Sequence, residues 1–374
     1  MASYDAPLAP ASTLAAEDLQ DFVRGAAFLG TGGGGDPYVG RLILQQEMTH
    51  GSAVRILPLH SLADDALVVP VAMMGAPTVM TEKVPSVPAL QRALAVVADR
   101  AGRPVDALIP LEIGGINSTM PLVVGARANL PVVNADGMGR AFPEIQMVTF
   151  GVYGCAISPV VVANEHGDVV TVDATSNKQG EDLARAVVVR MGGAAHIALY
   201  PMTGAEVKAT AIPDTLTLAL DIGRIIRTAR SARVRPEEAL FAHVAKLSVP
   251  RFSRVLYDGK IVDVRRETRG GFNVGSVTLD GIGDCKGSFK VEFQNENLVA
   301  YHDGKVAAMV PDLITLVDRE TIEPITTECL KYGQRVKVIG MSVPPIMRTP
   351  EALATFGPRA FRLDLDYIPL ENIR

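Results

Sequence analysis

Apolar residues recur three and four positions apart in several segments, and short continuous apolar runs lie between these segments. The first pattern predicts amphipathic helices, and the second predicts buried strands. We expect helices at residues 18–29, 37–50, 88–102 and 117–129, and strands at 54–59, 66–75, 105–115 and 130–140, the last two running into glycine turns. Because helices and strands alternate in this order, the N-terminal part is predicted to be an α/β sheet with its loops gathered at the strand ends.

The pattern changes after about residue 165. Helices are predicted at 178–191, 213–232 and 236–247, and from residue 252 onward short alternating runs are separated by DG and HDG turns, which indicate hairpins. The predicted fold class is therefore α/β, with a C-terminal α+β domain rich in antiparallel strands. We place the two domains at residues 1–168 and 169–374.

Composition narrows the class of protein. With 374 residues and 48% apolar content, the chain has enough apolar surface to form a compact core. The net charge of −5 comes with no run of like charges, and the segment RIIRTARSARVR is interpreted as a solvated helix face, so nucleic acid is not an expected partner. The N-terminus lacks the pattern of a signal peptide, and the apolar run 67–76 is too short to span a bilayer. Three scattered cysteines argue against a disulfide framework, so we expect a cytoplasmic protein without a membrane partner.

The stretch FLGTGGGGDPYVGR, residues 28–41, joins four glycines directly to a helix start at Asp36 and Pro37. Backbone N–H groups and the helix dipole then point to one spot, which favours an anion or a developing negative charge. No lysine follows the glycines as a phosphate loop requires, and a helix rather than a strand precedes them. We favour a cradle for a ligand or a transition state, and the alternatives are a tight turn between helices and a nucleotide site.

Two further loops combine an acid with glycines. Glu112 precedes Gly114 and Gly115 just before a helix that Ser118 or Thr119 is expected to cap, and Asp136 lies between a strand and a glycine turn. Carboxylates at strand ends serve as general acids, general bases or metal ligands. Each acid taken singly is as well explained by a cap or an ion pair, but three such loops within residues 28–144 favour one shared site.

These loops carry a resemblance to a known family. LGTGGGGDPYVG, IGGINSTMPLVVGARANLPVVNADGMGRAFPE, MVPDLITLVD, ITTECLKYGQRV and FGPRAF resemble the S-methyl-thiohydantoin desulfurase (S-Me-THD) family, which neighbours the hydantoinase and oxoprolinase proteins. The resemblance covers residues 15–370 and implies two domains and chemistry on hydantoin or thiohydantoin rings. It favours hydrolysis of 3-(5-oxo-2-thioxoimidazolidin-4-yl)propionate, in ergothioneine breakdown, to the hydantoin and hydrogen sulfide.

Replacing C=S by C=O requires a base to activate water, donors for the developing charge on sulfur, and an acid for the leaving sulfide. The acid–base candidates are Asp36, Glu112, Asp136 and Glu144, the last also a candidate for substrate binding. The candidates for holding the ring and its propionate are Gly33, Gly34, Gly35, Asn117, Ser118, Arg41, Arg140 and Arg127. In MVPDLI, Asp312 either holds the domains together or reaches the site.

Other routes stay open. Cys155 is a candidate nucleophile, with a buried structural cysteine as the alternative. The six histidines show no paired metal-binding spacing, so no cofactor is identified and a divalent metal is left open. Besides a hydrolase of a small ring substrate, the alternatives are a nucleotide-dependent ring opener, or a subunit of one, and a non-catalytic binding protein. A homo-oligomer is expected from the frequency of symmetric assemblies among soluble proteins.

Overall fold

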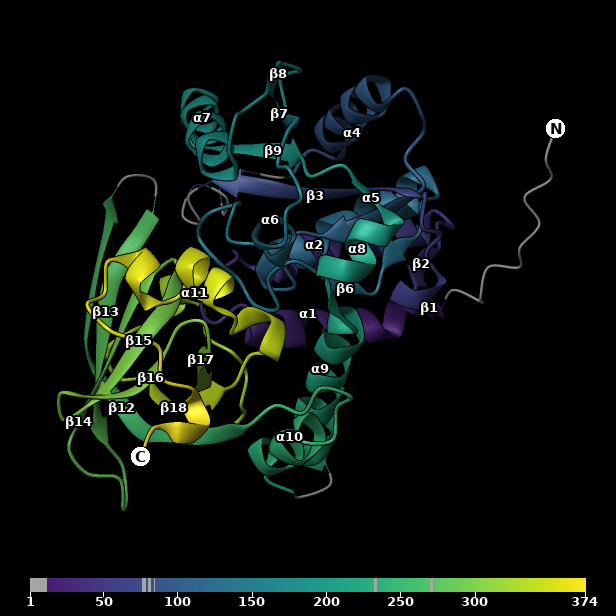
Figure 1. The fold of residues 1–374 in the computed structure, drawn as a ribbon. Coiled ribbons are helices and arrows are strands. Elements are labelled where there is room, and N and C mark those ends of the chain that lie inside the picture. The colour runs from purple at the N-terminus through teal and green to yellow at the C-terminus, as the bar shows by residue number, and fades with distance from the viewer. Residues whose placement is uncertain (1–11, 76–78, 80–81, 84, 232–233, 270–271) are drawn as a thin grey trace.

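Two β-sheets divide the chain between them (Figure 1). The structure is a computed structural model, and it describes residues 12–75, 79, 82–83, 85–231, 234–269 and 272–374. The first sheet lies at the upper right of Figure 1, and the second, in green, lies at the lower left with α11 (Pro350–Phe356) beside it. The predicted α/β part and the antiparallel C-terminal sheet are both confirmed.

The first sheet mixes parallel and antiparallel pairs in the order β1-β2-β5-β4-β3-β9-β7-β8, with β10 paired to β3. The pairs β2–β5, β5–β4 and β4–β3 are parallel. Its strands are β1 (Ser12–Leu14), β2 (Val54–Leu57), β3 (Leu67–Gly75), β4 (Ala107–Pro110), β5 (Val132–Val133), β7 (Val160–Ala163), β8 (Val169–Val172), β9 (Ala194–Ala198) and β10 (Met202–Thr203). Since β8 to β10 belong to this sheet, residues 169–203 lie with the N-terminal part, and a domain boundary at residue 168 stays a prediction.

Helices cover the first sheet and extend toward the second. They are α1 (Leu19–Leu29), α2 (Pro37–Thr49), α4 (Val87–Ala101), α5 (Met120–Ala128), α6 (Thr149–Val152), α7 (Asn177–Arg190), α8 (Gly204–Thr210), α9 (Thr215–Ser231) and α10 (Pro236–Val244). The start of α2 is as predicted, because the Tyr38 amide donates to the Asp36 side chain at 2.9 Å. Thr119 takes the N-cap position of α5 as predicted, but its side chain makes no capping hydrogen bond. The Ser118 and Thr119 hydroxyls donate instead to the Gly115 and Ile116 carbonyls of the preceding 3-10 turn.

The second sheet is antiparallel throughout, in the order β16-β15-β14-β13-β12-β18-β17. Its strands are β12 (Ser253–Arg269), β13 (Phe272–Gly281), β14 (Ser288–Gln294), β15 (Glu296–His302), β16 (Lys305–Met309), β17 (Leu313–Asp318) and β18 (Arg335–Met341). The edge strands β16 and β17 contact each other, so the sheet curls into a half-barrel. A two-stranded ribbon of β6 (Ala135–Asp136) and β11 (Ile212–Pro213) completes the strands of the described chain.

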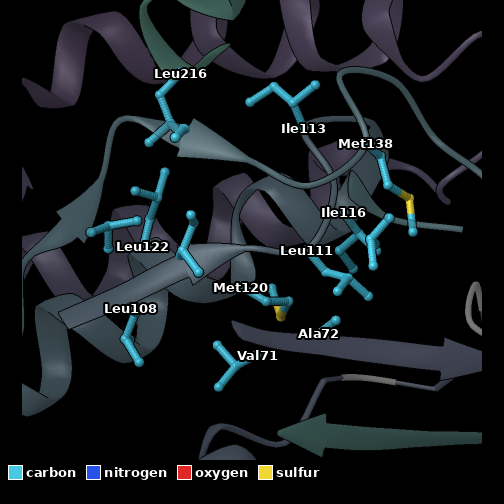
Figure 2. Packing of buried hydrophobic residues seen from close by; sticks show 14 of the residues in the cluster. Val71, Ala72, Leu108, Leu111, Ile113, Ile116, Met120, Leu122, Met138 and Leu216 are labelled. Carbon is cyan, nitrogen blue, oxygen red and sulfur yellow. The ribbon is translucent and has the colours of Figure 1, made fainter. Parts of the chain in front are cut away.

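A continuous apolar core lies beneath the loops that follow β4 and β5. Figure 2 shows Leu111, Ile116 and Met120 lying over Val71 and Ala72 of β3. All of these side chains are almost fully buried. The backbone after β4 is therefore fixed by apolar packing against β3.

Helices α1 and α9 approach each other closely through glycine. A Cβ at Gly25 would overlap the Ala219 backbone, and a Cβ at Gly223 would overlap the Asp21 backbone. Two helices meet this closely only where one side lacks a side chain.

We expect Gly25→Ala to lower the free energy of unfolding by about 1–3 kcal/mol through overpacking, although alanine is the better helix former. Urea denaturation measures the change. Gln20→Ala on the exposed face of α1 is the control and should leave the free energy within about 0.5 kcal/mol. A neutral or stabilising Gly25→Ala would contradict the close contact.

Candidate functional site

Two buried glutamates from different sheets line one small cavity. Glu112 lies in the loop after β4 and is 5% exposed, and Glu296, at the start of β15, is 2% exposed. The cavity has a volume of about 50 Å³ and is also lined by the glycine loop and by the ends of β3 and β4. This volume has room for one or two water molecules.

Glu112 is held by two N–H donors. The Asn117 side chain donates to Glu112 Oε1 at 2.7 Å, and the Phe142 amide donates to Oε2 at 3.4 Å. Asn117 is fixed in turn on β3, where its amide group both accepts from the Met73 N–H at 2.7 Å and donates to the Met73 carbonyl at 3.0 Å. Burial raises the pKa of Glu112 to about 8 against the effect of these hydrogen bonds.

Glu296 reaches the cavity from the hairpin between β14 and β15. Its Oε1 accepts from the Gly34 N–H at 3.2 Å, and its Oε2 is buried without a partner among the described residues. Burial first, and the neighbouring Glu112 second, raise the pKa of Glu296 well above its ordinary value. Two such neighbouring carboxyls do not both ionise readily, so the pair retains a proton near neutral pH.

The glycine loop is bare because other parts of the chain press against it. A Cβ at Gly33 would overlap the Glu296 carboxyl group, and a Cβ at Gly34 would lie 2.8 Å from the Gly114 carbonyl oxygen. Gly34 and Gly35 also adopt positive φ angles of 77° and 74°. The loop is therefore a close-packed turn between α1 and α2, and the acceptor at its Gly34 amide is the carboxyl group of the chain's own Glu296.

Arg140 links the two sheets rather than facing the cavity. Its five N–H groups donate to the carbonyls of Ala141, Pro311, Asp312 and Asn297 and to the Thr31 hydroxyl, at 2.7–3.2 Å. Burial lowers its pKa to about 10, so it stays charged at neutral pH. With every donor engaged, Arg140 has none left for a substrate carboxylate, which corrects the expectation that it binds the propionate.

Asp136 and Ser118 have positioning contacts. Asp136 Oδ2 accepts from the Ile113, Met138 and Gly139 amides at 2.8–3.1 Å, which joins the loops after β4 and β6. Burial raises the pKa of Asp136 to about 6, and its charge contributes to the raised pKa of Glu112. Ser118 donates to the Gly115 carbonyl at 2.7 Å, as noted for the turn before α5.

The remaining sequence candidates are not among the residues that line this cavity. Asp36 is exposed at the start of α2, and Arg41 contacts Gln45 and lies over the Tyr38 ring. Arg127 forms an ion pair with Glu47 at 3.6 Å.

Cys155 and Glu144 lie elsewhere. Cys155 is buried, and burial raises the pKa of its thiol, the reverse of what an activated nucleophile needs. Glu144 lines a separate, larger groove.

Asp312 holds the C-terminal segment in place. Its carboxylate accepts from the Val343 and Leu370 amides, the Tyr367 hydroxyl and the Arg348 guanidinium, at 2.8–3.2 Å. These four partners all belong to the C-terminal part, so they support neither of the two roles left open for Asp312, holding the domains together or reaching the site.

Sequence reasoning missed Glu296. In FQNENLVAY the triplet Asn295-Glu296-Asn297 stands between two apolar strands, which is typical of an exposed hairpin turn. All three residues are instead buried, and Asn297 is tied to the glycine segment because its N–H donates to the Thr31 carbonyl at 2.8 Å. One feature of the sequence could have indicated a buried turn: three polar residues stand in a row, whereas solvated hairpin turns more often contain glycine.

No group of three or more His, Cys, Asp or Glu side chains is arranged to hold a metal ion within the described ranges. His196 is buried and its Nε2 accepts from the Ser86 N–H at 2.8 Å. Burial lowers the pKa of His196 to about 4, so it is neutral under physiological conditions. No helix in the described part of the chain combines the length and apolarity needed to cross a membrane.

Comparisons with known proteins define the family. A model of the S-Me-THD-like N-terminal domain matches residues 17–174, and a model of the S-Me-THD-like C-terminal domain matches residues 175–370. The chain therefore belongs to the S-Me-THD-like family, which confirms the resemblance. A crystal structure of a protein from Chromobacterium violaceum has the same fold, with a TM-score of 0.80, 24% identity, and coverage of 96% of this chain and 100% of that chain. Among curated proteins no match was found.

Gly33→Ala should destabilise the protein by forcing Glu296 away from the Gly34 amide, at a cost of about 1–3 kcal/mol. Glu296→Ala removes the overlapping group, so Gly33→Ala should cost clearly less in that background. Urea denaturation of the four proteins in this double-mutant cycle measures the coupling. Additive effects would contradict the contact between Glu296 and the glycine loop.

Stability should fall as pH rises, because the folded protein keeps a proton on Glu112 that the unfolded chain loses. The pKa of Glu112 rises from 4.5 to about 8 on folding. The unfolded state thus binds fewer protons between these values, and one such group lowers the free energy of unfolding by at most about 1.4 kcal/mol per pH unit. Glu112→Gln should flatten this decline in urea denaturation from pH 5 to pH 8. The same slope in both proteins would show that Glu112 titrates normally.

Proposed function

We propose that this protein hydrolyses the C=S group of a thiohydantoin ring to C=O and releases hydrogen sulfide. The observation that carries the proposal is the pair of buried carboxyls, Glu112 and Glu296, facing one cavity with raised pKa values. Membership of the S-Me-THD-like family supports a thiohydantoin as the ring. The particular substrate that we propose is 3-(5-oxo-2-thioxoimidazolidin-4-yl)propionate, in ergothioneine breakdown.

The two carboxyls suit different steps. Glu112, whose oxygens accept two N–H hydrogen bonds that favour its ionised form, takes a proton from water as the water attacks C2 of the ring. The C=S bond becomes C–S⁻ in a tetrahedral intermediate. Glu296, whose pKa burial raises, donates a proton to sulfur. The C–S bond then breaks, and the C2 hydroxyl gives its proton to the departing hydrosulfide, so that C2 becomes a carbonyl and hydrogen sulfide leaves. The proton on Glu112 then returns to Glu296, which restores the pair.

Entry of the ring requires side chains to move, because a cavity of about 50 Å³ holds water and not a five-membered ring. Arg185 lines the cavity, and its guanidinium lies 4.6 Å from the centroid of the Phe272 ring, which lines the neighbouring groove. These two side chains stand in contact between cavity and groove, and we propose that their displacement admits the ring.

The alternatives receive less support. A nucleotide-dependent ring opener would place phosphate at the glycine loop, but the Gly34 amide is engaged by Glu296. A non-catalytic binding protein has no use for a carboxyl pair that keeps a proton near neutral pH, and turnover separates it from a hydrolase. A cytoplasmic location and a homo-oligomer stay predictions.

Sulfide release and the loss of thiocarbonyl absorbance test the proposal. With the thiohydantoin propionate as substrate, Glu112→Gln and Glu296→Gln should each lower kcat by about 10²–10⁴-fold, because each removes a group that transfers a proton. The wild-type rate should rise with pH toward the Glu112 pKa of about 8.

Asp36→Asn and Cys155→Ala are the controls and should retain activity. Absence of sulfide release from folded wild-type protein would refute the desulfuration. Loss of activity in Cys155→Ala alone would favour a covalent route, and loss after chelation would show that a metal takes part.

A further inference from the structure

A groove of about 740 Å³ runs between the two parts of the chain beside the carboxyl cavity. Ligand sites for small molecules usually have volumes of about 300–1,000 Å³. The groove is walled by residues of the N-terminal part, by β13 and the end of β12, and by α11 with the segment that follows it. Its size and its position between the two sheets suit a small ligand better than the cavity does.

Two arginines face this groove without an acidic partner. Arg269 ends β12 and Arg362 follows the 3-10 turn Pro358–Phe361, and neither forms an ion pair or a side-chain hydrogen bond with another described residue. Lys178, the third cation of the groove, is paired with Asp182 and lies 3.7 Å from Glu144. The charge left over in the groove is therefore positive.

The neighbouring hollow differs from the groove in that two of its cations are paired with acids. That hollow, of about 490 Å³, shares Val274, Gln294 and Phe361 with the groove. Arg265 there is paired with Asp263 at 2.9 Å, and Lys290 is paired with Glu292 at 2.6 Å.

Only a thin wall separates the groove from the reacting groups. In the segment 143–147, Pro143 and Ile145 line the cavity, and Glu144, Gln146 and Met147 line the groove. In the second sheet the groove residue Gln294 is followed directly by Asn295 and Glu296 of the cavity. A ligand could thus place one end in the cavity and the other end in the groove.

We infer that the groove binds a negatively charged side arm of the ring substrate, a carboxylate on a short chain, with Arg269 and Arg362 as its ion-pair partners. The inference rests on the proposed function, since it takes the ring to react between Glu112 and Glu296. It assigns Arg269 and Arg362 to specificity: they would select acidic thiohydantoins over neutral ones. Arg269 and Arg362 would also supply the positive charge for the substrate carboxylate, which Arg140 cannot provide because all its donors are engaged.

The test compares two thiohydantoins that differ only in one group, a carboxylate arm and the matching carboxamide. Calorimetry should show that the wild type binds the carboxylate about tenfold more tightly, the effect of about 1.4 kcal/mol from a pair of partly exposed ion pairs. The double variant Arg269→Gln, Arg362→Asn should lose this preference. Asparagine is chosen at 362 because the φ angle there is 61°, a conformation that asparagine tolerates.

Arg265→Gln is the matched control, because it removes a paired cation from the same strand and should keep the preference. If the acidic compound is turned over, its KM should rise about tenfold in the double variant, with kcat unchanged. Equal binding of the two compounds by the wild type, no binding of either, or an unchanged preference in the double variant would overturn the inference. Because the preference is measured by binding, a protein that prefers the carboxylate but releases no sulfide would refute the desulfuration and leave the groove assignment intact.

Discussion

Burial of the Arg140 guanidinium between the two sheets is the constraint on which the site depends. A buried charge is costly unless its donors are satisfied and opposite charge is near. Arg140 meets both conditions, because all five N–H groups have acceptors and Glu296, Asp312 and Glu112 oppose the loss of its charge. The acceptors of Arg140 come from the glycine segment and from the second sheet. Any shift of one sheet against the other would therefore leave some of its N–H donors without acceptors.

The close packing of the two sheets around Arg140 also brings the two carboxyls of the site together. Glu112 is positioned from the first sheet through Asn117 and β3, whereas Glu296 arrives from the second sheet and rests on the glycine loop. Both carboxyls line one cavity that is formed by both parts of the chain, and burial is the largest cause of each raised pKa. The acid–base pair therefore exists only while the two parts of the chain are packed together.

Much of the local structure could be predicted from the chain itself. The helix at Pro37–Thr49 follows from Asp36 and Pro37, and the hairpins β13–β14 and β15–β16 follow from alternation and DG turns, because these signals act within a few residues. The DG pair at residues 258–259 is no turn, since it lies inside β12. Glu112 and Asn117 could be selected as site residues because glycines and a helix start surround them. Glu296 could not, since an acid between two asparagines in a hairpin is ordinarily solvated, and only contact with Gly33 and Gly34 buries it.

The sequence by itself determined the two sheets, the order of the elements, the bare loop before α2 and the presence of several acids beside glycines. Only the tertiary structure decided what each of these groups touches. It pairs the Gly34 amide with Glu296, engages every N–H donor of Arg140 between the two sheets and exposes Asp36 to solvent. Within the described residues it leaves Arg269 and Arg362 of the groove without an ion pair. The reason is physical: helix caps and turns depend on neighbours in the chain, whereas a carboxyl such as that of Glu296 has partners far away in the sequence, with Gly34 at a separation of 262 residues.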